Sequence, residues 1–390
     1  MVSTYRAARG EWTPLKLPER ILAHRAAVAR WKEQGAARYR PLEYDAETTD
    51  LPPVRVVDMR AELKEGNSSI FSRLLQHSLQ QVLAHEQQAI LFVNRRGMAT
   101  YVFCRECGHT LKCPRCEIPL TYHLASEQQE EGLLCHRCNY RRKMPARCPQ
   151  CGSHKIRHYG LGTERVEREV AQIFPRARLL RWDRSTTRRK GAHQDILERF
   201  ASHQADVLIG TQMLAKGLDL PLVTLVGVVL ADVGLNLPDY RAGERVFQVL
   251  TQVAGRAGRS PLGGQVVLQT FQPEHYVIQA AARHSYAEFY RRELAYRREL
   301  LYPPFSRLAR LELRGPEEVD IQQALEDVAA LLRRRGLGDH HLIGPVPCFF
   351  RRVAGAYRWQ IVLRGPNPAA LLQDLMLPDL RIEVDPPSLL

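Results

Sequence analysis

Eight of the nine cysteines stand in four C-x-x-C pairs, all between Cys104 and Cys151. A C-x-x-C hairpin places two thiolates on one side of a tight turn, and two hairpins supply the tetrahedral set of four sulfur ligands that zinc prefers. Disulfide bonds and an iron–sulfur cluster are alternative uses of these thiols, but four evenly built hairpins favour zinc. Because sulfur would fill every ligand position, we interpret the two sites as structural.

The four pairs can be matched in three ways. The 18 residues between Cys116 and Cys135 suit a four-cysteine zinc ribbon, whereas sequential matching would leave gaps of 5 and 9 residues. Gly108 and Gly152 follow the outermost pairs, where a turn can need a positive φ, and no glycine follows the inner pairs. We therefore expect nested pairing. One Zn²⁺ is then bound by Cys113, Cys116, Cys135 and Cys138, and the other by Cys104, Cys107, Cys148 and Cys151.

A second stretch with chemical potential runs from Gly210 to Asp219. It leaves an expected strand with a hydroxyl, an amide and a lysine close together, at Thr211, Gln212 and Lys216. An earlier strand, 89–94, likewise ends in polar residues, Asn94 and Arg95. In open α/β sheets, ligands bind at the carboxyl ends of the strands, so both stretches are candidate binding segments.

The third stretch runs from Gln252 to Arg259. On a helix, Gln252, Arg256 and Arg259 fall on one face at i, i+4 and i+7. Two arginines on one face suit a triphosphate, although a solvated helix face would be the ordinary interpretation. The glycines at 255 and 258 favour the functional one, because glycine is costly in a helix unless the backbone must approach something closely.

The elements that would position these groups alternate between strand and helix from residue 53 to residue 272. Such alternation predicts an α/β domain with a parallel sheet, and the cysteine-rich module interrupts it after its second strand. The expected strands are 54–58, 89–94, 177–183, 206–211, 222–232 and 265–270. The expected helices are 72–85, 160–174, 194–202 and 241–256.

The flanking segments have other patterns. Residues 278–300 read as one helix rich in tyrosine and arginine. The last part of the chain then follows the order β-α-β-β-α-β of a small split-βαβ domain, with strands at 307–313, 342–346, 358–363 and 381–385 and helices at 320–334 and 368–375. Before the sheet, residues 21–32 have helical spacing, and residues 42–53 read as a linker that ends in Pro52-Pro53.

The composition indicates which kinds of molecule this protein is expected to bind. The formal net charge is +14, and two four-thiolate zinc sites would lower it to roughly +10, which still suits a polyanion such as nucleic acid. We expect no membrane partner, because the longest apolar run is far too short to cross a bilayer. Thiol clusters without a signal peptide predict a reducing, cytoplasmic location. The unpaired Cys348 reads as a core residue.

Together these motifs resemble one family. Residues 92–97, 210–219 and 252–259 look like motifs IV, V and VI of superfamily 2 helicases. A double-zinc insertion between motifs IV and V resembles the primosomal protein N′ (PriA) family of bacterial replication-restart DNA helicases. Further matches are Val57 to Leu63, Gly162-Thr163-Glu164, Trp182-Asp183-Arg184, Tyr302 to Phe305, Tyr357 to Gln360 and Val384 to Pro386. The resemblance covers about residues 3–19 and 53–390.

The resemblance implies a fold class and an activity. The fold would be a second RecA-like helicase lobe (53–98 and 160–272) with an inserted double-zinc module (99–159), a helical connector (273–303) and a small α+β C-terminal domain (304–390). Residues 1–52 would follow the first motor lobe. The activity would be ATP-dependent 3′–5′ unwinding of forked or single-stranded DNA in replication restart and primosome assembly. Single-stranded DNA-binding protein and other primosome proteins would be partners.

The same resemblance assigns roles to residues. Arg256 and Arg259 would contact the γ-phosphate, with Gln252 beside them, and the nucleotide side would also include Gly217, Asp219 and Gly255. The DNA side would include Asn94, Arg95, Thr211, Gln212 and Lys216.

One departure is large. The sequence contains no Gly-Lys-Ser or Gly-Lys-Thr of a P-loop and no Asp-Glu pair for Mg²⁺. ATP and Mg²⁺ would therefore bind only together with a first motor lobe, and we do not expect this chain to hydrolyse ATP alone. The alternative is a non-catalytic zinc-containing module that binds DNA or protein, and a zinc-containing RNA helicase is a third possibility.

Overall fold

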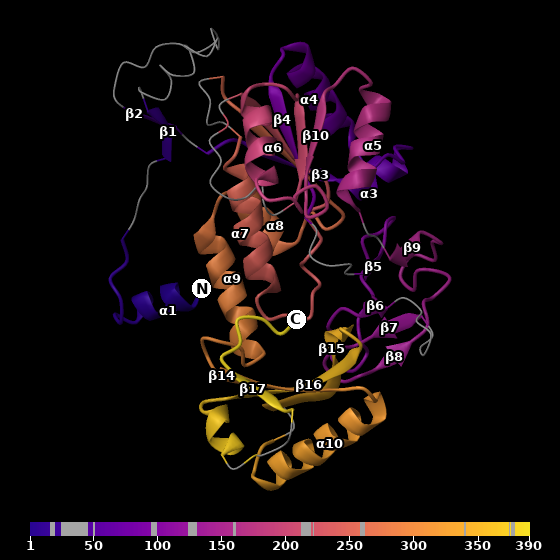
Figure 1. The fold of residues 1–390 in the computed structure, drawn as a ribbon, viewed down its shortest axis with the longest axis vertical. Helices are drawn as coiled ribbons and strands as arrows, with labels where there is room; N and C mark the ends of the chain where they lie inside the picture. The colour runs from indigo at the N-terminus through magenta and orange to yellow at the C-terminus, as the bar shows by residue number, and fades with distance from the viewer. Residues whose placement is uncertain are drawn as a thin grey trace.

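The computed structural model describes residues 1–15, 20–24, 46–49, 51–94, 100–123, 131–158, 161–211, 220, 222–257, 262–338, 341–373, 375 and 379–390. Figure 1 shows the parallel sheet and its helices at the top, the cysteine-rich module at the lower right, and the C-terminal domain at the bottom. Within the described residues, no helix combines the length and the apolar character needed to cross a bilayer.

The largest sheet has six strands in the order β10-β11-β4-β12-β13-β3, and all neighbouring pairs are parallel. This confirms the expected α/β sheet, although β12 is shorter than the predicted 222–232. The strands are β3 (Val54–Asp58), β4 (Gln88–Phe92), β10 (Leu179–Trp182), β11 (Val207–Gly210), β12 (Val223–Val228) and β13 (Gln265–Thr270).

Helices cover both faces of this sheet, which explains why its inner strands are continuous apolar runs. On one face, a hydrophobic core contains Ile90 and Phe92 of β4; on the other, a second core contains Ala89 and Leu91. The first core includes residues of α6 (Ala192–Ala201), α7 (Ala242–Ala254) and α8 (Tyr276–Ala282). The second includes residues of α3 (Met59–Lys64), α4 (Arg73–Ala84) and α5 (Thr163–Ile173).

The cysteine-rich module leaves the sheet after β4 and returns to it before α5. It forms a five-stranded antiparallel sheet in the order β8-β7-β6-β5-β9. In its core, cysteines of both clusters pack with apolar residues such as Val102, Leu120 and Leu133. The strands are β5 (Thr100–Cys104), β6 (Thr121–His123), β7 (Gly132–Leu134), β8 (Arg141–Arg142) and β9 (Ile156–His158).

The helical connector is two helices, so the prediction of one helix over 278–300 is wrong. The chain turns after α8 at His284, whose φ is +52°, and Ser285 then caps α9 (Tyr286–Glu299) by accepting a hydrogen bond from Glu288 N. Helix α9 is fixed to α7 by Arg297, a fully buried side chain that pairs with Glu293 and Glu244, each at 2.9 Å.

The C-terminal domain has the expected β-α-β-β-α-β order, except that a 3₁₀ segment stands in place of the second α-helix. Its antiparallel sheet is arranged β15-β16-β14-β17, and Trp359 packs from β16 into the core beneath α10. Strand β15 runs past the predicted end at residue 346, and the second predicted helix is a single 3₁₀ segment, η3. The elements are β14 (Arg307–Gly315), α10 (Glu318–Arg334), β15 (Leu342–Val353), β16 (Ala356–Gly365), η3 (Pro368–Leu372) and β17 (Arg381–Val384).

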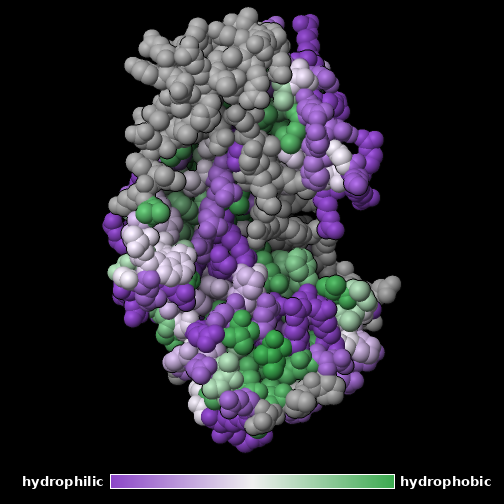
Figure 2. Space-filling model, turned by 60° about the vertical axis from the view of Figure 1, so that its left-hand side comes forward, coloured by the Kyte–Doolittle hydropathy of each residue, from purple (hydrophilic) through white to green (hydrophobic). Residues whose placement is uncertain are grey.

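The C-terminal domain contacts both other parts of the molecule. Its last residues lie against the segment before α7, where Ser388 Oγ donates to Asp239 at 2.6 Å. On the cysteine-rich module, His136 Nδ1 lies 3.0 Å from the carbonyl oxygen of Pro347. Figure 2 shows hydrophobic surface gathered over the lower, C-terminal end of the face that it presents.

The N-terminal segment contains α1 (Val2–Ala8), which packs on the connector. The ring of Tyr5 lies 5.4 Å from that of Phe305, and the hydroxyls of Thr4 and Tyr286 are 2.8 Å apart. β1 (Arg20–His24) and β2 (Ala46–Thr49) then pair antiparallel. The predicted helix over 21–32 is therefore wrong where it overlaps β1, and its remainder lies outside the described residues. The predicted linker 42–53 contains β2.

Candidate functional site

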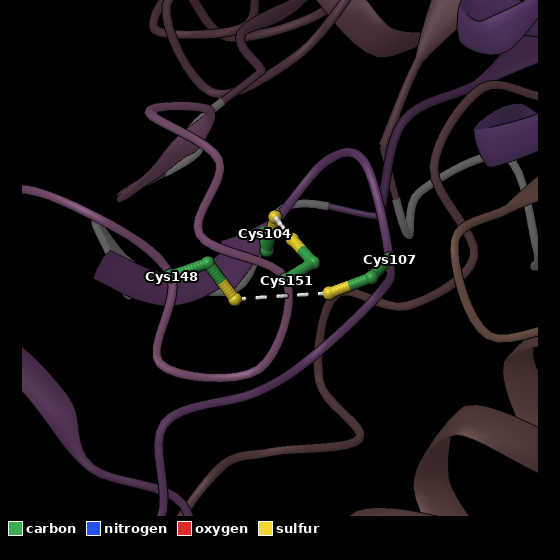
Figure 3. Close-up of side chains that lie close together, drawn as sticks. All are labelled: Cys104, Cys107, Cys148 and Cys151. Atoms are coloured by element: carbon green, nitrogen blue, oxygen red, sulfur yellow. Dashed lines mark hydrogen bonds between the residues drawn. The ribbon is translucent and has the colours of Figure 1, made fainter.

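The eight paired cysteines form two clusters in the nested arrangement. Within each cluster the four sulfur atoms lie within 4.8 Å of one another. Figure 3 shows Cys104, Cys107, Cys148 and Cys151 converging from two hairpins, with Sγ–Sγ distances of 3.6 Å for Cys104–Cys151 and 3.7 Å for Cys107–Cys148. Four sulfurs about 2.3 Å from a central zinc would be roughly 3.8 Å apart, so the donor set fits the ion. The second cluster comprises Cys113, Cys116, Cys135 and Cys138.

All four hairpins have the same backbone turn. The residue after each second cysteine donates its N–H to the carbonyl of the first, at 2.8 to 3.0 Å. That residue has a positive φ in every case: +76° at Gly108, +55° at Glu117, +56° at Asn139 and +71° at Gly152. The glycines therefore did not distinguish outer from inner pairs, because Glu117 and Asn139 adopt the same conformation. The spacing argument alone supported nesting correctly.

The outer cluster is joined directly to the parallel-sheet domain. A Cβ added to Gly108 would lie 2.6 Å from the carbonyl oxygen of Phe271 and 3.2 Å from the Arg60 side chain. The rings of Phe103 and Phe271 are 4.8 Å apart, and the guanidinium of Arg105 lies 5.8 Å from the Phe271 ring. The first hairpin therefore anchors the module to the segment that follows β13. Sequence reasoning missed this contact, because nothing in the spacing of residues identifies the partner of Gly108.

We expect Gly108→Ala to destabilise the protein more than Gly152→Ala. Both residues have a positive φ, which would cost an alanine about 1–2 kcal/mol. Only Gly108 also faces a backbone atom closer than a methyl group tolerates, whereas a Cβ at Gly152 would meet no atom within 4 Å. Overpacking adds about 1–3 kcal/mol. Denaturant unfolding of the two variants, with zinc content measured in parallel, checks this; equal losses would contradict the anchoring contact.

The carboxyl edge of the parallel sheet brings two predicted DNA-side residues onto neighbouring strands. β11 pairs with β4 so that Gly210 lies opposite Phe92, which places Thr211 and Asn94 just beyond adjacent strand ends. Asn94 is only 4% exposed, and its amide donates to the carbonyl of Val233. Its side chain thus fixes the loop after β12. Five other residues predicted in these segments lie outside the described part of the chain: Arg95, Gln212, Lys216, Gly217 and Asp219.

The predicted helix does not continue as far as Arg256, and the expected position of Arg259 on its face is untested. Helix α7 ends at Ala254, and Arg256 lies in the turn that follows, with its N–H donated to Val253 O at 2.9 Å. Gln252 is exposed on the last helical turn, whereas Arg256 is 8% exposed. Gly255 has an ordinary φ of −64°. Gly258 and Arg259 lie outside the described residues.

Strand direction separates these two groups of residues. Because β12 and β13 are parallel, the intervening α7 must return from the carboxyl edge of the sheet and end near the amino edge. Arg256 therefore follows the helix at the opposite edge from Asn94 and Thr211. Among the described residues, the predicted nucleotide-side Arg256 and the predicted DNA-side Asn94 and Thr211 thus lie at different edges of the sheet.

Several residues that carried the family resemblance serve the fold. Thr163 at the start of α5 is fully buried and donates to Asp183 at 2.5 Å, which joins two motifs that are distant in sequence. Burial opposes ionisation of Asp183, but hydrogen bonds from Ser185, Thr163 and backbone N–H groups outweigh it and lower its pKa to about 2. In the C-terminal domain, Trp359 Nε1 donates to Glu318 at 2.8 Å.

Asp232 is a buried carboxyl group that sequence reasoning did not select. It follows β12 and accepts hydrogen bonds from Thr270 Oγ1 at 2.7 Å and Phe271 N at 3.0 Å. Burial raises its pKa to about 6 despite these bonds. It therefore fixes the segment against which the outer zinc hairpin packs. The sequence feature that could have identified Asp232 is its position directly after the ten-residue apolar run 222–231.

Asp232 makes stability depend on pH. Its folded-state pKa lies above its ordinary value, so the folded protein binds an extra proton between about pH 4 and pH 6, and stability falls as pH rises through this window. We expect the wild type to gain stability relative to Asp232→Asn on acidification from about pH 7.5 to about pH 5.5. Urea unfolding of both proteins checks this. A difference in stability between the two proteins that does not change with pH would contradict this expectation. Loss of zinc at acidic pH affects both proteins alike, so it does not change the difference.

Comparison with known families gives three matches along the chain. The PriA DNA helicase Cys-rich region (CRR) domain matches residues 113–143, the Helicase conserved C-terminal domain matches residues 164–261, and the Primosomal protein N C-terminal domain matches residues 298–387. Each match falls on the part of the fold for which it is named.

Curated relatives point the same way. The chain is 46% identical over 340 residues to replication restart protein PriA of Synechocystis sp., covering 87% of this chain and 41% of that protein. It is 44% identical over 314 residues to PriA of Bacillus subtilis, covering 80% and 38%. For PriA of Chlamydia pneumoniae the identity is 38% over 346 residues, covering 85% and 46%. The chain thus spans less than half the length of these relatives.

The parallel sheet matches the helicase C-terminal domain family, and the cysteine-rich module, whose two clusters support two zinc ions, matches the PriA zinc-region family. The chain belongs to the PriA family of replication restart proteins and corresponds to its C-terminal part.

Proposed function

We propose that this chain acts as the second motor lobe, zinc module and C-terminal domain of a PriA-type ATP-dependent 3′–5′ DNA helicase in replication restart and primosome assembly at stalled forks. The observation that carries the proposal is the position of the double-zinc module. It interrupts a parallel sheet of helicase type directly after β4, and both the sheet and the module match their own helicase families.

In the proposed mechanism, DNA and the arginine contacts to the nucleotide lie at different edges of the sheet. At the carboxyl edge, Asn94 holds the loop after β12, and Thr211 and its neighbours contact the DNA backbone. Arg95, Gln212 and Lys216 complete this DNA side. Arg256 and Arg259, with Gln252, reach a nucleotide held by another lobe, and Gly217, Asp219 and Gly255 belong to the same nucleotide side. The placement of Arg256 after a returning helix supports this division.

ATP and Mg²⁺ would be bound mainly by that other lobe. The chain has no P-loop sequence, whose backbone and lysine bind the phosphates in helicase motors. What this chain supplies is positive charge from arginine, which stabilises the charge that develops on the transferred phosphoryl group. We also propose single-stranded DNA-binding protein and other primosome proteins as partners, because the relatives are replication restart proteins.

The test combines DNA binding with ATP turnover. We expect the zinc-loaded chain to bind forked DNA with a strong dependence on salt and to hydrolyse no ATP. Adding a separately produced first motor lobe of a PriA relative should produce DNA-stimulated ATP hydrolysis. Binding of forked DNA without hydrolysis in the mixture would favour a non-catalytic DNA-binding module, and a preference for RNA over forked DNA would favour an RNA helicase.

A further inference from the structure

The loop that follows β10 carries an unusual concentration of exposed positive charge. Residues 184–190 include Arg184, Arg188, Arg189 and Lys190, all exposed, and no acidic residue. Arg189 pairs with Asp195. Among the described residues, Arg184, Arg188 and Lys190 have no acidic partner. Three exposed cations without an acidic partner within seven residues raise the local positive potential, which attracts polyanions.

The first half of the loop is held by hydrogen bonds to Asp183. The buried carboxylate of Asp183 accepts from Ser185 N at 2.7 Å and Thr186 N at 3.1 Å. The hydroxyls of Thr186 and Thr187 donate to the Asp183 carbonyl at 3.0 and 2.8 Å. These bonds fix the backbone of residues 183–187, from which Arg184 projects and which leads directly into Arg188. A partly fixed loop loses less entropy when its cations bind a ligand.

The loop lies beside the proposed DNA side of the domain. In the sheet, β10 pairs with β11 so that Trp182 lies opposite Gly210, and Thr211 N donates to Trp182 O at 3.4 Å. Strands β4, β11 and β10 are consecutive neighbours, about 4.8 Å apart. A strand of DNA that crosses the ends of β4 and β11 therefore reaches the end of β10 next.

We propose that the loop 184–190 is a third phosphate-contacting segment on the carboxyl edge of the lobe, and that Arg184, Arg188 and Lys190 bind the sugar-phosphate backbone of single-stranded DNA. This inference rests on the proposed function, because it extends the DNA side beyond Asn94 and Thr211. The contacts are to phosphate, so they strengthen binding without selecting a base sequence. Asp183 acts as a positioning residue that fixes the loop.

The chain offers a matched control for the test. Arg176 is an exposed arginine before the amino end of β10 and, among the described residues, has no acidic partner. Arg188→Ala and Arg176→Ala remove the same side chain and the same charge from opposite ends of one strand. Both side chains are exposed, so both variants should fold, and thermal unfolding verifies this.

The experiment measures binding of a fluorescein-labelled oligothymidylate to the zinc-loaded chain over a range of salt concentrations. We expect Arg188→Ala, and separately Lys190→Ala, to reduce the slope of log K against log salt by about 0.7 each, the value for one phosphate contact on a single strand. Arg176→Ala should leave the slope unchanged, and Arg188→Lys should largely restore it, because a phosphate contact needs the charge.

The outcomes separate this inference from the function on which it rests. If the wild type binds but Arg188→Ala and Lys190→Ala have the same slope as Arg176→Ala, the loop is not a phosphate contact, and the proposed function stands. If the wild-type chain does not bind the oligothymidylate even at low salt, the proposed DNA side is wrong, and the loop proposal is wrong with it.

Discussion

Replacing Cys104 and Cys148 together by alanine should leave a chain that retains one zinc ion of two. The two residues lie in different hairpins but in the same cluster, so the double variant removes two ligands from one site and none from the other. Sequential matching of the pairs would instead take ligands from both sites and leave no zinc. Elemental analysis of the purified variant decides between these results.

The energetic effect should be the largest of any change in this protein. Zinc binding contributes about 10–16 kcal/mol to the folding of small structural sites. We expect its hairpins to become sensitive to protease around residues 104–109 and 148–153, while the parallel sheet stays folded. Cys348→Ala is the control, because Cys348 is buried in the C-terminal domain outside both clusters. Iron in place of zinc, or no zinc in the double variant, would contradict the assignment.

The second large effect is expected at Arg256. When this chain is combined with a first motor lobe, Arg256→Ala should lower DNA-stimulated ATP hydrolysis by about 10³- to 10⁵-fold, the contribution of an arginine finger in phosphoryl transfer. Steady-state hydrolysis at saturating DNA measures this. Unchanged hydrolysis would mean that Arg256 does not reach the nucleotide.

A conservative variant distinguishes chemistry from packing. Arg256 is 8% exposed, so truncation to alanine also removes buried contacts. Arg256→Lys keeps the aliphatic stem and the charge but lacks the planar, bidentate guanidinium. We expect it to unfold at nearly the wild-type temperature and still lose most of the hydrolysis. The exposed Arg176→Ala variant should match the wild type in both measurements.

Much of the architecture could be predicted because it depends on local patterns. The apolar runs of β4, β11 and β12 are continuous, since both faces of a parallel sheet are covered by helices. The order of strands and helices in the C-terminal domain followed from periodicity in the same way. The nested cysteine pairing followed from chain length between hairpins, which limits the sulfurs that can meet.

The incorrect predictions arose where competing local conformations had similar energies. The face of Gln252, Arg256 and Arg259 assumed a helix that continued through Gly255, but the chain ends α7 at Ala254. The connector looked like one helix, because the turn at His284 uses a positive φ that its residue type does not announce. Histidine can adopt this conformation at a modest cost, and tertiary packing on α7 and β3 decides that it does.

The sequence by itself determined which residues are available for chemistry: eight thiols in four hairpins, polar groups after apolar strands, and arginines beside glycines. Each of these features depends on the spacing of a few neighbouring residues, and the covalent chain keeps such residues close together whatever the fold. Only the tertiary structure decided which groups meet. It buried Asn94 against Val233, packed Gly108 on Phe271, and placed the basic loop after β10 beside Thr211. These contacts join residues far apart in the chain, so they depend on how the sheet, the zinc module and the helices pack together.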